Sequence, residues 1–376
     1  MKKYLILFLM FAGLILCGCT SKDNRTVIQF ASWGSKSEID ILIPLLTKFE
    51  EQNPDIKVDF MHIPQNYFQK IHLLFASRKA PDVIFVNNLY LPVYANAGVL
   101  EPLTVEGAEY FPQALNALCW HGVLYAVPRD VSNLAIYYNK DIFDKYGVKY
   151  PDENWTFDDF LHTAQKLTRD GIFGISFEEE ALFFLPYLMS EGGGILSDDL
   201  SKEIIDTQQS QKGLNFYADL RKKYHVAPMK SESASATMAQ MFLQEKLAMQ
   251  LSGRWLTPKY TSDAKFSWDV VRFPKGDAGS IVPLDASGWA ISKDSKNKAA
   301  ALRLVNFLSS RESSIEFIKS GLIVPARQDV KDEFLNSAKG SQTFRNIIST
   351  SKPTPVSVNY NEVLDKLSEK LEYKFN

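Results

Sequence analysis

Three of the six tryptophans stand where β-rich runs end, each beside glycine or serine. Trp33 lies in Ser-Trp-Gly, Trp255 follows Ser-Gly-Arg and Trp289 follows Ser-Gly. A core position is the usual alternative for a single tryptophan, but small neighbours also let a ligand reach the face of an indole ring. The apolar face of a sugar ring packs on such a surface, and the sugar's hydroxyls then need charged or amide partners.

Side chains able to bind those hydroxyls stand near the same positions. Arg254 directly precedes Trp255, Arg129 and Asp130 are adjacent in the chain, and Arg327 follows another short apolar run. A structural or solvated ion pair is the alternative for any single arginine. The candidate ligand-binding residues are Ser32, Trp33, Asn87, Asn88, Arg129, Asp130, Arg254, Trp255, Gly288, Trp289 and Arg327.

The stretch 120–140 must position several of these side chains. Residues 123–127 and 134–138 are β-type runs, and the proline and polar residues between them predict one long strand broken in the middle. A strand that leaves one sheet and enters another is a crossover between domains, and polar groups at its break face a cleft. Those groups are Arg129, Asp130, Ser132 and Asn133. An ordinary strand, loop and strand is the alternative interpretation.

Before this stretch, predicted strands and helices alternate. Residues 27–31, 56–60 and 81–86 read as strands, and apolar residues at helical spacing over 39–49 lie between the first two. This alternation predicts an α/β fold with a mostly parallel sheet. Ligands of such sheets bind beyond the carboxyl ends of the strands. The residues at those ends are Ser32, Trp33, Asn87 and Asn88.

Six segments occur in an order typical of one protein family. They are PDVIFVNN, AGVLEPLT, YAVPRD with LAIYYNKDIF, EKLAMQLSGRW, SGWAIS and GLIVPAR. The ordered set resembles the extracellular solute-binding proteins of ABC importers, in the carbohydrate-binding branch that includes the maltose and multiple-sugar binding proteins. The resemblance covers most of the chain. The sequence departs from it at Asn87 and Asn88, where an aromatic or acidic residue is common.

The resemblance implies a two-lobed periplasmic-binding-protein fold. Each lobe would be a mostly parallel sheet flanked by helices, with the ligand cleft between the lobes. A chain of 376 residues also exceeds what one core usually supports, which independently favours two domains. The expected N-terminal lobe is 27–128 with 287–323, the C-terminal lobe is 129–286 with 324–376, and the hinge strands are near 127–132, 284–288 and 324–327.

By the same resemblance, the protein captures a sugar or oligosaccharide by hinge closure. A ligand that touches both lobes stabilises the closed state because it binds that state more tightly. The implied partners are the permease subunits and the ATPase of an ABC transporter. We expect a monomer that carries no cofactor.

Residues 1–18 are expected to be a signal peptide. Lys2 and Lys3 precede an apolar run over 4–16, which is short for a transmembrane helix. Leu-Cys-Gly-Cys over 16–19 resembles a bacterial lipobox, which makes Cys19 the lipidated residue and 19–26 a tether. A plain signal peptide with incidental cysteines is the alternative. The expected location is the cell envelope, either on the periplasmic side of the inner membrane or on the outer cell surface.

The composition gives no reason to expect a nucleic acid or a metal. The formal net charge is −2, and removal of Lys2 and Lys3 with the signal peptide makes it −4. The five histidines are scattered, without the spacing of a metal site. Once the signal peptide with Cys17 is removed, Cys119 is the only cysteine besides Cys19, so we expect no internal disulfide.

We expect a binding protein rather than an enzyme. Sugar hydrolysis needs two positioned carboxylates, whereas the acidic runs 158–159 and 178–180 read as solvated faces. The sequence has no Gly-x-Ser-x-Gly motif. Two alternatives stay open: a binder of another small solute, namely a uronate, sugar phosphate, iron chelate or polyamine, and a surface carbohydrate hydrolase. The arginines argue against a polyamine and are compatible with a uronate or a sugar phosphate.

Overall fold

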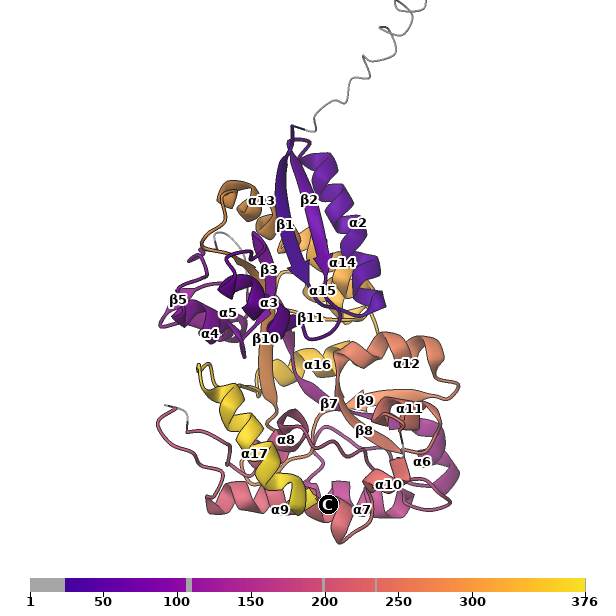
Figure 1. The fold of residues 1–376 in the computed structure, drawn as a ribbon. Coiled ribbons are helices and arrows are strands. Elements are labelled where there is room, and N and C mark those ends of the chain that lie inside the picture. The colour runs from indigo at the N-terminus through magenta and orange to yellow at the C-terminus, as the bar shows by residue number, and fades with distance from the viewer. Residues whose placement is uncertain (1–23, 106–109, 198–199, 234, 376) are drawn as a thin grey trace, which may run out of the picture.

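The computed structural model describes residues 24–105, 110–197, 200–233 and 235–375. They form two lobes that meet at a waist (Figure 1). The predicted signal peptide and Cys19 lie outside the described residues. Within these four ranges, no helix is both long and apolar enough to cross a bilayer.

The first lobe is built on a mixed sheet. Strands β1 (Thr26–Ser32), β2 (Ile56–His62) and β3 (Val83–Asn87) run parallel to one another. Strands β10 (Pro283–Ile291), β6 (Val127–Ser132) and β11 (Val324–Pro325) continue the sheet with antiparallel pairing, in the order β11-β6-β10-β3-β1-β2. Residues 83–86 of β3 are all buried, as their continuous apolar run predicts.

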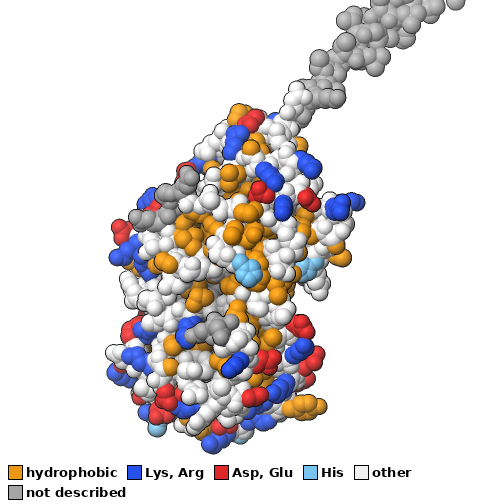
Figure 2. Space-filling model, turned by 90° about the vertical axis from the view of Figure 1, so that its left-hand side faces the viewer, with side chains coloured by type: hydrophobic (Ala, Val, Ile, Leu, Met, Phe, Trp, Pro, Cys, Tyr) orange, Lys and Arg blue, Asp and Glu red, His pale blue; other side chains and the backbone are white. Residues whose placement is uncertain are grey.

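Helices cover this sheet on both sides. Helices α2 (Lys36–Gln52), α13 (Lys298–Leu308) and α14 (Arg311–Lys319) contact one another. Helices α3 (Tyr67–Ala76), α4 (Leu91–Asn96) and α5 (Pro112–Ala117), with the hairpin of β4 (Cys119–Trp120) and β5 (Val123–Leu124), lie on the other side (Figure 1). On the face seen in Figure 2, apolar side chains run through the middle of this lobe toward the waist.

The second lobe surrounds a three-stranded sheet. Strand β7 (Leu134–Asn139) pairs with β8 (Met249–Gly253) and with β9 (Trp268–Val271), in both cases antiparallel. The prediction of a mostly parallel sheet is therefore wrong for this lobe, and in the first lobe it holds only for β1, β2 and β3. A continuous apolar run shows that a strand is buried on both faces, but it does not fix the direction of the neighbouring strands.

Most of the remaining helices belong to the second lobe. The helices that surround its sheet are α6 (Lys140–Tyr146), α7 (Phe157–Leu167), α8 (Ala181–Ser190), α9 (Gln208–Lys222), α10 (Lys230–Ser233), α11 (Met238–Leu243), α12 (Thr257–Asp263), α16 (Ser341–Ile348) and α17 (Tyr360–Phe375) (Figure 1). Helix α15 (Lys331–Leu335) follows β11 beside α14, and β12 (Lys352–Pro353) pairs with the start of β10.

Three strands carry the chain between the lobes, and they are neighbours in one sheet. Asp285 of β10 is paired with Ser132 of β6, and Pro325 of β11 is paired with Asp130 of β6. The predicted break in the central stretch lies at Asn133, between β6 and β7, rather than at Pro128, which is inside β6. The side-chain amide of Asn133 donates to the carbonyl oxygen of Phe344 at 3.0 Å, which fixes the break against α16.

Candidate functional site

Two adjoining cavities lie between the lobes and share Trp33, Glu38, Trp255 and Leu322. We refer to them together as the interlobe cleft. The inner cavity has a volume of about 240 Å³ and is lined by Trp33, Glu38, Arg129, Asp130, Val131, Ser132, Asn133, Arg254, Trp255, Ser287, Leu322, Ile323 and Val324. The outer cavity, of about 1230 Å³, extends along the start of α2 and along α12, which face each other at the waist (Figure 1).

Trp33 forms the first-lobe wall directly after β1. Its indole packs against the rings of Tyr67, Phe68 and Phe85, with ring centres 5.0, 5.2 and 4.3 Å away. The Tyr67 hydroxyl donates to the carbonyl oxygen of Ala31 at 3.0 Å and so ties this ring cluster to β1. Trp33 is therefore half-buried, with a fixed ring that borders both cavities.

Trp255 forms the opposite wall, in the short 3₁₀ helix Arg254–Leu256 that follows β8. Its ring lies over Gly253, where an added Cβ would stand 1.9 Å from Cζ3 of the indole. The residue remains 38% exposed. The glycine makes room for the indole itself, whereas the sequence argument expected it to make room for the ligand.

A buried ionic cluster joins the start of α2 to β6. Nε of Arg129 donates to Oδ1 of Asp130 at 2.7 Å, and Nη1 of Arg129 donates to Oε1 of Glu38. The guanidinium also lies 4.2 Å from the ring centre of Phe85. Burial opposes the charge of Arg129, but the two carboxylates outweigh it and raise its pKa. One guanidinium thus pairs with two carboxylates, so this wall of the cleft carries an excess negative charge.

Asp130 faces the inner cavity with spare hydrogen-bonding capacity. Burial raises the pKa of its carboxyl group, and Arg129 offsets this only in part. Arg129 binds Oδ1, and no described side chain or backbone group donates to Oδ2. A carboxylate held in this way can accept hydrogen bonds from ligand hydroxyls.

Arg254 lines the same cavity from the second lobe. Its Nη2 donates to the hydroxyls of Ser337 and Ser341 at 2.9 and 3.0 Å. Its Nε and Nη1 are buried without a hydrogen-bond partner. Burial lowers the pKa of Arg254 to about 10. The cleft therefore combines two indole rings, an acceptor carboxylate and an arginine with unused donors.

Five of the eleven candidate ligand-binding residues thus border the cleft: Trp33, Arg129, Asp130, Arg254 and Trp255. Ser132 and Asn133, which the break was predicted to turn toward a cleft, also line it. Trp289 does not, because it is fully buried in the first-lobe core between the rings of Phe30 and Phe85. It stands on the central strand β10, which lies between β6 and β3 and contacts helices α5 and α13. The motif Ser-Gly-Trp alone does not reveal this burial.

The remaining predicted residues also make structural contacts outside the cleft. Asn88 is fully buried and donates to Asp285 and Thr354 at 3.0 and 2.6 Å. Asn87 accepts a hydrogen bond from the backbone N–H of Tyr90, and the buried Ser32 donates to the carbonyl oxygen of Trp33. Arg327 forms an ion pair with Asp329. Gly288 lies so close to Val127 that an added Cβ would stand 2.2 Å from the carbonyl oxygen of Val127.

Sequence reasoning missed Glu38 as part of this site. Glu38 is buried in the first turn of α2, four residues after Gly34, and the side chain of Glu38 lies where a Cβ on Gly34 would be. An acidic residue in the first turn of a helix usually needs no explanation beyond the helix dipole. The position of Glu38 in the sequence was therefore what any acidic residue in the first turn of a helix shows, and it gave no indication of the site.

A sequence-family model for the bacterial extracellular solute-binding proteins matches residues 35–314. The chain belongs to this family. The family is one of binding proteins, and the matched range includes Arg129, Asp130 and Arg254 of the interlobe cleft, whereas Trp33 lies just before it. The acidic run 178–180 is not among the residues that line the cleft, and the carboxylate on its second-lobe wall is that of Asp263 at the end of α12.

Solved structures and a sequence relative agree with this membership. An ABC substrate-binding protein from Listeria monocytogenes in complex with cycloalternan is 27% identical, with a TM-score of 0.87 over 94% of each chain. Maltose-bound MalE3 of T. maritima is 25% identical, with a TM-score of 0.81 over 93% of this chain and 94% of that one. The galactooligosaccharide-binding protein of Bacillus subtilis (strain 168) is 22% identical, over 96% of this chain and 90% of the relative. The two-lobed α/β fold is thereby confirmed.

Proposed function

We propose that this solute-binding protein captures a sugar or oligosaccharide in the interlobe cleft and delivers it to an ABC permease. The observation that carries the proposal is the pair Trp33 and Trp255, one indole from each lobe, beside the acceptor carboxylate of Asp130. Indole faces pack on sugar rings, and carboxylates bind their hydroxyls. Relatives bound to cycloalternan and maltose support a carbohydrate as the ligand.

Capture works by closure about the three crossing strands. The boundaries that we propose from the sequence are 27–128 with 287–323 for the first lobe and 129–286 with 324–376 for the second. They fall inside the crossing strands β6 and β10 and at the start of β11, whose residues pair in the first-lobe sheet. The crossings at β6, β10 and β11 lie side by side, so they can act as one hinge. A ligand between Trp33 and Trp255 contacts both lobes only when they are close, which couples its binding to the closed state.

The cell-envelope setting is part of the same proposal. Cleavage before Cys19 and lipidation of its thiol would hold the protein at the membrane, where the permease subunits and their ATPase take up the released ligand. Cys19→Ser is expected to release the protein from the membrane fraction. A Cys19→Ser protein that stays membrane-bound and lipidated would show that the anchor lies elsewhere.

Two other functions are distinguished by binding and product analysis. A thermal-shift screen over mono- and oligosaccharides, sugar phosphates and iron chelates identifies the ligand class, because bound ligand raises the melting temperature by mass action. We expect sugars to give the largest shifts. A response only to non-sugar solutes would replace the carbohydrate proposal. Mass spectrometry after long incubation is expected to recover the sugar intact, and turnover would favour a hydrolase.

A further inference from the structure

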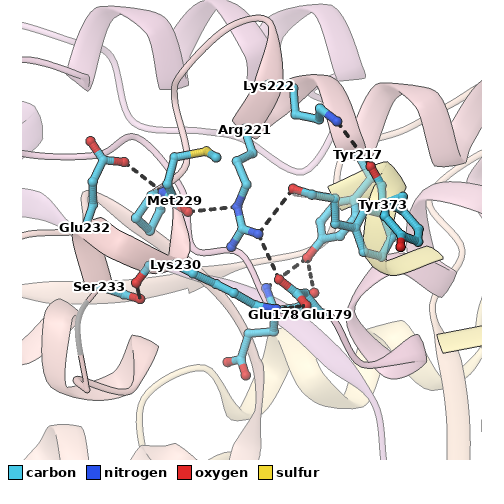
Figure 3. Close-up of polar contacts among 12 residues, drawn as sticks. Glu178, Glu179, Tyr217, Arg221, Lys222, Met229, Lys230, Glu232, Ser233 and Tyr373 are labelled. Atoms are coloured by element: carbon cyan, nitrogen blue, oxygen red, sulfur yellow. Dashed lines mark hydrogen bonds and ion pairs between the residues drawn. The ribbon is translucent and has the colours of Figure 1, made fainter. Parts of the chain in front are cut away.

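The described part of the chain contains four arginines that are less than a tenth exposed: Arg129, Arg221, Arg254 and Arg327. Three of them bind carboxylates: Arg129 binds Glu38 and Asp130, Arg221 binds Glu179, and Arg327 binds Asp329. Figure 3 shows the arrangement around Arg221, whose guanidinium lies between Glu179 and carbonyl oxygens. Across the described ranges, no acid lies within ion-pair distance of Arg254.

The partners that Arg254 does have are neutral. They are the hydroxyls of Ser337 and Ser341 and the rings of Phe334 and Phe344, 4.5 and 5.8 Å from the guanidinium carbon. Two of its three nitrogens, Nε and Nη1, lack any acceptor. A buried cation with no counter-charge is costly, and adding an anion recovers part of that cost.

Arg254 is also the unpaired arginine that borders the ligand cavity. The paired Arg221 and Arg327 lie outside the interlobe cleft, and Arg129 in the cleft already has two acids. The missing counter-charge therefore lies at the wall of the cavity between Trp33 and Trp255, where Nε and Nη1 are themselves covered, so a ligand reaches them once the Arg254 side chain shifts.

We propose that Arg254 binds a carboxylate of the ligand, so that the captured sugar is an acidic one bearing a uronate-type group. This inference rests on the proposed function. The sugar's hydroxyls face Asp130 on the first-lobe wall, its ring lies between Trp33 and Trp255, and its carboxylate accepts from Nε or Nη1 of Arg254. Such a charge-assisted hydrogen bond is stronger than one between neutral groups.

The charge of the cavity favours a carboxylate over a phosphate. Arg129, Glu38 and Asp130 together leave one excess negative charge on the first-lobe wall. Arg254 offsets that excess, so a bound monoanion leaves one net negative charge in the cavity, whereas a phosphate, with close to two negative charges, leaves more.

The test is a matched-pair titration by calorimetry on the full chain. Maltotriose, cellotriose and β-1,4-galactotriose are each compared with the form in which the C6 group of one residue is oxidised to a carboxylate, and with a 6-phosphate. We expect the wild type to bind at least one carboxylate form about tenfold or more tightly than its neutral counterpart and its phosphate. If the neutral sugars bind as tightly as their carboxylate forms, or more tightly, the inference is overturned and the proposed function stands. A preference for the phosphate form has the same consequence. Binding of none of them would contradict both.

Variants then attribute the preference to Arg254. Arg254→Gln is expected to reduce the affinity for the carboxylate form to that for the neutral sugar, while Arg254→Lys keeps part of the preference. Arg303→Gln is the matched control, because Arg303 is exposed and paired with Asp55 in the first lobe. A preference unchanged in Arg254→Gln would overturn the assignment. If Arg254→Gln does not fold, the matched sugars titrated into Arg254→Lys and into the wild type still test the assignment.

Discussion

The indole rings of Trp33 and Trp255 border one cleft from opposite lobes, and different contacts hold them. Trp33 is fixed by the rings of Tyr67, Phe68 and Phe85, whereas Trp255 lies over Gly253 and keeps 38% of its surface exposed. An aromatic side chain supported on one side and open on the other can contact a ligand without being part of the core.

Trp255→Ala is expected to weaken sugar binding by roughly tenfold or more and to change the melting temperature little. Aromatic packing contributes about 0.5–1.5 kcal/mol beyond area burial, and each tenfold in affinity corresponds to about 1.4 kcal/mol. Trp289→Ala is the contrast, because it opens a cavity in the core and should cost about 3–5 kcal/mol of stability. Calorimetry and thermal unfolding on both variants check this, and a collapsed melting temperature in Trp255→Ala would contradict it.

Glu178 should make stability depend on pH. Burial, helped by the nearby charge of Glu180, raises the pKa of Glu178 from 4.5 to about 7. The folded protein therefore binds a proton that the unfolded chain has released, so the free energy of unfolding falls as the pH rises from about 4.5 to 7. After allowance for partial exposure we expect a loss of roughly 1–2 kcal/mol. Denaturant titrations at several pH values measure it, and a Glu178→Gln protein with the same pH dependence would refute this source.

Among the elements, the junction of β8 with the 3₁₀ helix that follows it decides the geometry of the second-lobe wall. Gly253→Ala would place a Cβ 1.9 Å from the Trp255 ring, so the ring must move. We expect affinity for the sugar to fall as far as in Trp255→Ala. Ser252→Ala, one residue earlier on β8, is the control and should bind normally. Unchanged affinity in Gly253→Ala would show that the position of this ring does not matter for binding.

At the same scale, local patterns predicted strands and crossings better than they predicted burial. Polar residues between two β-type runs correctly indicated that Arg129 and Asp130 border a cleft, because the point where a strand leaves one lobe for the other lies between the lobes. A nearby glycine or serine was common to the core residue Trp289 and to Trp33 and Trp255, which border the cleft. Trp289 is buried because β10 became the central strand, and Arg254 is unpaired because α15 and α16 bring only serines and phenylalanines to it. Both facts depend on residues distant in the sequence.

For the whole molecule, the three adjacent crossings predict a closing motion. Small-angle scattering with the bound sugar is expected to give a smaller radius of gyration than without it, since the ligand stabilises the state in which both lobes contact it. Trp255→Ala at the same sugar concentration should stay nearer the unliganded value. A radius that does not change at saturation would contradict closure as the mechanism.

The central position of β10 also sets an order of assembly during synthesis. This strand lies between β6 and β3, so until residues 283–291 are made the first-lobe sheet consists of two separate pieces. Residues 27–128 therefore cannot complete the first-lobe sheet until about three-quarters of the protein has been translated. A truncated chain ending at residue 275 should accordingly be digested by protease throughout 27–128, whereas one ending at 323 should protect that region. A first lobe that folds late stays unfolded for longer, which suits the export that the proposed signal peptide would direct.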